Sequence, residues 1–235
     1  MLKPWSVVDF VLIWLGGILG AGVIYAAATV LGDDELAVVL GLAGQYIGSL
    51  GVFWLLRRQR SRPVGFNVEP TDVLYVGIGL LLQTVLAVAF LPLTLLLFPD
   101  RTPPQQVAQA LADIESSLLL KLVLVLAAVL LAPITEELMY RGVLLRAVDG
   151  RSRRFVMVVT ALVFSLAHVV GLDPERPLAS AAVALPQIFL LGLTLAWVTL
   201  RAKRLGPAIF VHSGWNLLAV VILLLPQDLL EIPPT

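Results

Sequence analysis

The sequence predicts an all-α membrane protein, a polytopic helical bundle of about seven transmembrane helices. Hydrophobic residues make up 59% of the 235 residues and charged residues only 14%, and the mean hydropathy is +0.96. A soluble domain of this size carries about 25% charged residues. Apolar runs recur along the chain, and basic residues gather in alternate loops between them. These observations predict one integral membrane domain with its N-terminus inside and its C-terminus outside.

Seven apolar runs meet or approach the roughly 20 residues that a helix needs to cross a bilayer. In chain order they cover residues 5–31, 36–56, 73–98, 118–148, 155–171, 180–200 and 207–225. The first run lacks a small-residue cleavage site, so we expect it to remain as a helix. Within the single membrane domain, we distinguish an N-terminal part, 1–117, with three helices and a surface segment, from a four-helix core, 118–225.

Charged loop residues indicate the orientation. With the N-terminus in the cytoplasm, twelve of the sixteen lysine and arginine residues fall in cytoplasmic segments. They are Lys3, Arg57, Arg58, Arg60, Arg62, Arg146, Arg151, Arg153, Arg154, Arg201, Lys203 and Arg204. Acidic residues dominate the opposite loops, as the positive-inside rule requires.

Several segments between and within the runs indicate packing rather than chemistry. Gly16 to Gly20 and Gly44 to Gly48 each have the small-xxx-small spacing that lets transmembrane helices approach closely. The basic loop 57–72 is expected on the cytoplasmic surface, and 99–117 is expected to include a short helix on the other side.

The chain has no cysteine, which excludes disulfides, thiolate metal sites and a cysteine nucleophile.

A few polar side chains remain deep inside the apolar runs. They are Glu136, Glu137 and Arg141 in the fourth run, His168 in the fifth, and His212 and Asn216 in the seventh. A charge at the bilayer centre costs roughly 2.5–3.5 kcal/mol on insertion scales, so such residues indicate a functional site. Counted at ~1.5 Å per residue from the cytoplasmic arginines, three of these groups can meet in one layer. These are Glu136, His168 and His212.

Spacing within the fourth run separates the two glutamates. Glu137 and Arg141 lie four residues apart and can pair along one face, whereas Glu136 points about 100° away and stays free. The pair has an equally good structural interpretation, as a buried contact that fixes the rotation of the helix. Pro133 cannot donate to the carbonyl four residues back, which leaves an acceptor for water.

This set of groups suits hydrolysis without a serine or cysteine nucleophile. Glu136 and His168, facing a water molecule, can remove its proton. His212 and Asn216 provide hydrogen-bond donors for a developing oxyanion. Zinc bound by both histidines and Glu136 is an alternative, although the sequence has no HExxH spacing.

Three motifs resemble a known family. EELMYR (136–141) matches EExxxR, FSLAH (164–168) matches FxxxH, and HSGWN (212–216) matches HxxxN. In this order they resemble the CPBP intramembrane proteases, which include type II CAAX prenyl endopeptidases and abortive-infection-type relatives. The resemblance covers roughly 118–222.

The resemblance implies roles for each motif residue. Glu136 and His168 would activate water, and His212 and Asn216 would form the oxyanion hole. Glu137 and Arg141 would support the site. It also implies peptidase activity without a catalytic metal or other cofactor.

We therefore expect an intramembrane endopeptidase that acts on a membrane-bound peptide or protein substrate within the lipid bilayer. No nucleic-acid partner is expected. Thirteen arginines against three lysines favour a bacterial genome rich in G and C, and thus a bacterial cytoplasmic membrane. Two alternatives keep the same polar cluster. One is a non-catalytic scaffold or regulatory protein, and the other is a transporter or proton relay. The absence of internal repeats disfavours the transporter.

Overall fold

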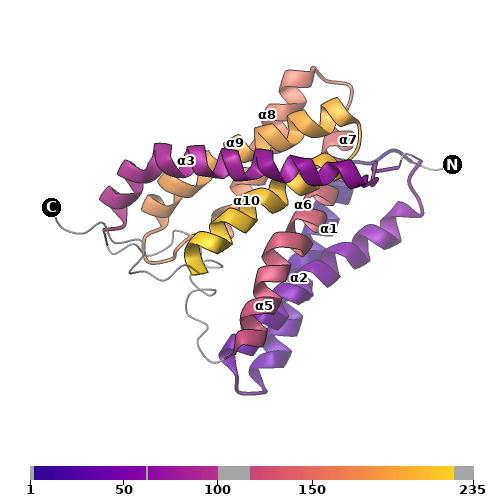
Figure 1. Ribbon diagram of the computed structural model, residues 1–235. Helices are drawn as coiled ribbons and strands as arrows, with labels where there is room; N and C mark the ends of the chain where they lie inside the picture. The colour runs from indigo at the N-terminus through magenta and orange to yellow at the C-terminus, as the bar shows by residue number, and fades with distance from the viewer. Residues whose placement is uncertain (1–2, 62, 100–116, 225–235) are drawn as a thin grey trace.

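The computed structural model describes residues 3–61, 63–99 and 117–224, and no strand occurs among them. Seven helices of this part are long and apolar enough to cross a membrane (Figure 1). They cover Val7–Thr29, Asp34–Arg57, Pro70–Leu97, Leu118–Ala147, Arg153–Gly171, Pro177–Ala202 and Gly206–Leu224. The predicted all-α fold is confirmed, with every helix end within three residues of its expected place. Most of the expected surface helix in 99–117 lies outside the described residues.

Polar residues at the ends of the apolar runs determine where several helices begin. The hydroxyls of Ser6, Ser117 and Ser152 accept hydrogen bonds from backbone N–H groups in the first turns of α1 (Val7–Thr29), α5 (Leu118–Leu126) and α8 (Arg153–Ala167). Asp33 caps α2 (Asp34–Arg57) in the same way. Such caps satisfy N–H groups that have no partner inside the helix.

The first two helices pack through their glycines. A Cβ atom at Gly20 would overlap the Gly44 carbonyl oxygen, and one at Gly48 would overlap the Gly16 carbonyl oxygen. The predicted close packing of α1 on α2 is therefore confirmed, because only glycine leaves room for this approach. In Figure 1, α5 runs beside this pair, and α3 (Val76–Leu97) lies across α10 (Gly206–Leu224).

The fourth span is not a regular α-helix. After α5 it continues through η2 (Ala127–Leu131), α6 (Ala132–Glu137), η3 (Leu138–Leu144) and α7 (Leu145–Ala147), and both η segments are π-helical. The Ala132 N–H donates to the Ala127 carbonyl, five residues back. In this register Pro133 faces the Ala128 carbonyl and has no N–H to offer. The fourth helix thus contains a carbonyl without its helical donor, that of Ala128, about two turns before the two glutamates.

Glycines also fix α10 against α3. A Cβ atom at Gly79 would overlap the Val211 carbonyl oxygen, and one at Gly214 would overlap the Val76 carbonyl oxygen. These two contacts flank His212, so they determine the rotation of the helix that carries His212 and Asn216.

The loop between α2 and α3, which we call the strap (58–61 and 63–69), crosses the end of the bundle where the basic residues lie. Arg60 of the strap forms an ion pair with Asp9, which is 1% exposed. The Asp9 carboxylate is therefore enclosed by the protein, and Arg60 supplies its counter-charge. Val64 is buried and packs against Gly142 of η3. A Cβ atom added at Gly142 would lie only 3.2 Å from the Val64 Cβ.

The far end of the strap is bound to the turn between α9 (Pro177–Ala202) and α10. The Leu205 N–H donates to the Gly65 carbonyl at 3.0 Å, and the Gly206 N–H donates to the Asn67 carbonyl at 3.2 Å. Arg204 pairs with Asp72 of the short helix η1 (Pro70–Tyr75). The hydrogen bond to Asp72 raises the pKa of Arg204, so the pair stays charged at physiological pH.

Candidate active site

Two fully buried charges form the base of the polar cluster. Glu137 and Arg141 are both 0% exposed, and Arg141 Nη1 lies 3.0 Å from Glu137 Oε1. The predicted pairing along the helix is therefore present. Arg141 Nη2 also donates to the Gly192 carbonyl of α9 at 3.1 Å. Gly192 packs so closely on Ala161 of α8 that a Cβ there would approach it to 3.0 Å. This contact connects the fourth span to the α8–α9 pair.

Both glutamates face His212. Its Nδ1 lies 3.0 Å from Glu137 Oε1, and its Nε2 lies 4.0 Å from Glu136 Oε2. A carboxylate oxygen accepts hydrogen bonds, so Nδ1 carries the proton in the first contact. Glu136 and Glu137 were expected to point in different directions. In the structure the His212 ring lies between their carboxylates, so both are near the same side chain.

His168 is oriented by its own helix. It follows the last residue of α8, and its Nδ1 lies 2.8 Å from the Phe164 carbonyl oxygen one turn back. A carbonyl oxygen can only accept, so Nδ1 is the donor. In the neutral ring the lone pair then lies on Nε2, which is the nitrogen left for other chemistry.

Phe164 is the packing centre of the cluster. The ring is 0% exposed and meets the rings of His168 and His212 edge to face, with centroid distances of 4.8 Å and 5.7 Å. The guanidinium carbon of Arg141 lies 4.4 Å from its centroid, and Tyr140 contacts it at 5.0 Å between centroids. Phe164 thus contacts both histidines and the buried arginine.

Asn216 takes a position that the sequence does not indicate. Its amide Nδ2 donates to the Ala128 carbonyl at 2.7 Å. This is the carbonyl that Pro133 cannot serve in the π-helical register. The sequence predicted a free carbonyl four residues before Pro133, at Val129; in the π-helical register the carbonyl without a donor is that of Ala128, and a side chain of α10 binds it. One of the two amide N–H groups of Asn216 remains.

Of the two glutamates in the cluster, Glu136 has the more exposed carboxylate. Its side chain is 22% exposed, although its Oε2 atom is buried without a hydrogen-bond partner among the described residues. Tyr46 of α2 is buried and lies within electrostatic range of this carboxylate. A carboxylate that is partly open and lacks a hydrogen bond can accept one from water.

Three contributors were not singled out in the sequence. Gly192 and Ala128 act through backbone carbonyls, which no side-chain pattern reveals. Tyr46 belongs to a helix without a motif, and its aromatic ring in an apolar run indicates packing as well as any other role.

A metal centre finds no ready set of ligands. In the part of the chain that the structure describes, no three histidine, aspartate or glutamate side chains come together as metal ligands would. The polar groups form a series of contacts that runs from Arg141 through Glu137 and His212 to Glu136, and His168 contacts the shared ring of Phe164.

Comparison with known proteins agrees with the motifs. The family model described as "Type II CAAX prenyl endopeptidase Rce1-like" matches residues 118–218, which include all three motifs. No curated protein and no solved structure matches the chain. Seven apolar helices and this match identify an integral membrane protein with the features of a membrane protease. Residues 118–218 are thus similar to the Rce1-like type II CAAX prenyl endopeptidases.

Proposed function

We propose that the protein is an intramembrane endopeptidase that uses activated water to hydrolyse a peptide bond of a membrane-bound peptide or protein. Glu136 and His168 remove the proton of the water, and His212 and Asn216 stabilise the oxyanion. Glu137 and Arg141 hold the site in place. The reaction needs no metal in this proposal, and the membrane is the cytoplasmic membrane of a bacterium.

The observation that carries the proposal is the different anchoring of the two histidines. His168 donates from Nδ1 to a neutral carbonyl, which leaves the Nε2 lone pair for a proton from water. His212 donates from Nδ1 to the Glu137 carboxylate at 3.0 Å, and its Nε2 lies 4.0 Å from Glu136 Oε2, beyond hydrogen-bond distance. In this proposal His168 is therefore the base, and His212, which is held by a buried carboxylate, is the donor.

Asn216 supports the donor side of the mechanism. Its bond to Ala128 fixes the amide and leaves its second N–H for the substrate oxygen. A fixed donor stabilises an oxyanion better than a mobile one, because no reorganisation is needed when the charge develops.

The substrate is a peptide segment at the membrane. The description of the matched family names prenylated CAAX proteins as its substrates. A bacterial host favours unprenylated peptides or membrane-protein segments instead. The purified protein should therefore be tested in vesicles with two peptides that end in a CAAX sequence and differ only in the prenyl group.

The decisive experiment replaces Glu136 by glutamine. This change keeps size and hydrogen bonding but removes the base, so proteolysis should be abolished while membrane levels stay close to wild type. Each assay is repeated after treatment with a strong chelator, which should leave activity unchanged. Glu175→Gln, in the loop before α9, is the matched control and should be fully active. Normal activity of a well-expressed Glu136→Gln protein would leave the scaffold alternative in place of the protease.

A further inference from the structure

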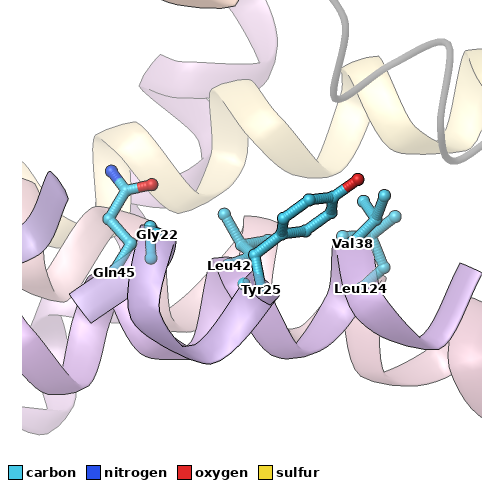
Figure 2. A pocket seen from close by; sticks show the side chains of 8 residues that line it. Gly22, Tyr25, Val38, Leu42, Gln45 and Leu124 are labelled. Atoms are coloured by element: carbon cyan, nitrogen blue, oxygen red, sulfur yellow. The ribbon is translucent and has the colours of Figure 1, made fainter. Parts of the chain in front are cut away.

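A cavity of about 350 Å³ lies between α1, α2 and α5, and its lining includes no residue of the candidate active site. Its walls are largely apolar and include Val38, Leu42 and Leu124, while Tyr25 and Gln45 contribute polar tips on the same side of the groove (Figure 2). Val38 is 40% exposed and Tyr25 44%, so the groove opens to the surroundings of the transmembrane region.

Gln45 lies at the middle of the membrane. It is 11 residues from the start of α2 at Asp34 and 12 from its end at Arg57, which places it about 17 Å from either end of the helix. Its amide has no hydrogen-bond partner within the part of the chain that the structure describes. An unsatisfied amide in hydrocarbon is costly, so its partner must come from outside this part of the chain.

The depth of Gln45 decides which kind of molecule can provide that partner. Acyl chains carry no hydrogen-bonding group at the centre of a bilayer, and water is absent there. A transmembrane helix can place a polar side chain at this depth, and glutamine and asparagine hydrogen-bond across helix interfaces in membranes. Tyr25 lies about 6 Å from the end of α1, at Thr29, where a phenol meets the membrane interface.

From these observations we infer that the groove is a docking site for a single transmembrane helix of another protein, one with an uncharged polar residue at mid-membrane depth. Its apolar face packs between α1 and α5, and its polar side chain exchanges hydrogen bonds with Gln45. Gly22 faces open space in this groove, since a Cβ there would meet no atom within 4 Å. The inference does not depend on proteolysis, because none of the residues that line the groove belongs to the candidate active site.

Photo-crosslinking in phosphatidylcholine vesicles tests the docking site. The probes are a lysine-flanked polyleucine helix with one asparagine at its centre and the same helix without it, both at a low peptide-to-lipid ratio. A photoreactive amino acid replaces Val38 in the groove or, as a control, Leu91 of α3, which is 49% exposed. The two sites are similarly deep, because both lie near helix ends on the same side of the membrane.

The asparagine helix should crosslink at Val38 about threefold to tenfold more than the polyleucine helix, as expected for one interhelical hydrogen bond. Leu91 should not distinguish the probes. Gln45→Leu should abolish the preference, whereas Gln83→Leu, which removes an amide from α3, should preserve it. Equal crosslinking of both helices at Val38 would overturn the inference, and so would a preference that survives Gln45→Leu. Crosslinking to lipid that the asparagine helix cannot displace would also overturn it and assign the groove to lipid.

Discussion

Arg141 is a buried cation in a membrane-spanning helix, and three different groups contact its guanidinium. Glu137 supplies the counter-charge, the Gly192 carbonyl accepts a second hydrogen bond, and the Phe164 ring lies against the guanidinium. A guanidinium suits this role better than an ammonium, because its flat fork can bind a carboxylate and a carbonyl while it stacks on a ring. The arginine thereby connects three helices.

Removal of this arginine should therefore act mainly through the charge that it leaves behind. Arg141→Ala strands Glu137 without its cation, and we expect a loss of about 3–5 kcal/mol in the free energy of unfolding. The double variant Arg141→Ala, Glu137→Gln should recover much of that loss. Unfolding of the purified proteins in detergent measures both. A double variant as unstable as the single one would show that the lost packing, and not the stranded charge, dominates.

Asn216 allows the chemistry to be separated from structure at a single side chain. Under the proposed mechanism, Asn216→Ala should lower kcat by about 10²–10³-fold and leave KM nearly unchanged, as loss of one oxyanion donor does. Gln187→Ala is the control, because Gln187 also donates its amide to a backbone carbonyl, that of Val183, outside the cluster. A variant whose only defect is lower stability would assign Asn216 to packing.

At the scale of the helices, the π-helical turns of the fourth span place the two glutamates and the arginine on the side facing α8–α10. A π-helical turn inserts one residue into the helical register, so every later side chain is rotated relative to a regular helix. Pro133 allows this turn, because it offers no N–H to compete with the Asn216 amide for the Ala128 carbonyl.

A residue with a backbone N–H in place of Pro133 should therefore disturb the site while the fold stays intact. Pro133→Ala provides a backbone donor and a better helix former. We expect the thermal stability to stay equal or rise, while proteolytic activity falls at least tenfold. Activity and melting temperature measured on the same preparation test this. Unchanged activity would show that Asn216 and the glutamates are positioned independently of the π-helical turn.

Seven helices and their ends could be predicted from the sequence, because hydrophobic length and capping residues are local properties. The Glu137–Arg141 pair was predictable for the same reason, since both residues lie on one turn. The contacts of Glu137 with His212 and of Asn216 with Ala128 were not, because each joins helices far apart in the chain. The irregular register of the fourth helix has no signal beyond Pro133, and the burial of Asp9 depends on a loop residue 51 positions away.

At the scale of the whole molecule, the orientation in the membrane stays a prediction with a direct test. The chain has no cysteine, so single cysteines can be introduced without removing any. Asp34→Cys, at the start of α2, should react with a membrane-impermeant thiol reagent added to intact spheroplasts. Arg151→Cys, in the loop before α8, should react only after the membrane is opened. The reverse pattern would overturn the N-in orientation and place the strap outside the cell.

The strap also has a consequence for the order of events during synthesis. Its Gly65 and Asn67 carbonyls bind Leu205 and Gly206, which leave the ribosome about 140 residues later. At about 5–20 residues per second, the strap waits on the order of ten seconds for its partners. His212 and Asn216 emerge later still, on α10. A newly made chain thus makes the six described spans before α10 without a complete cluster of polar groups, and under the proposed mechanism it cannot cut anything until α10 has been made.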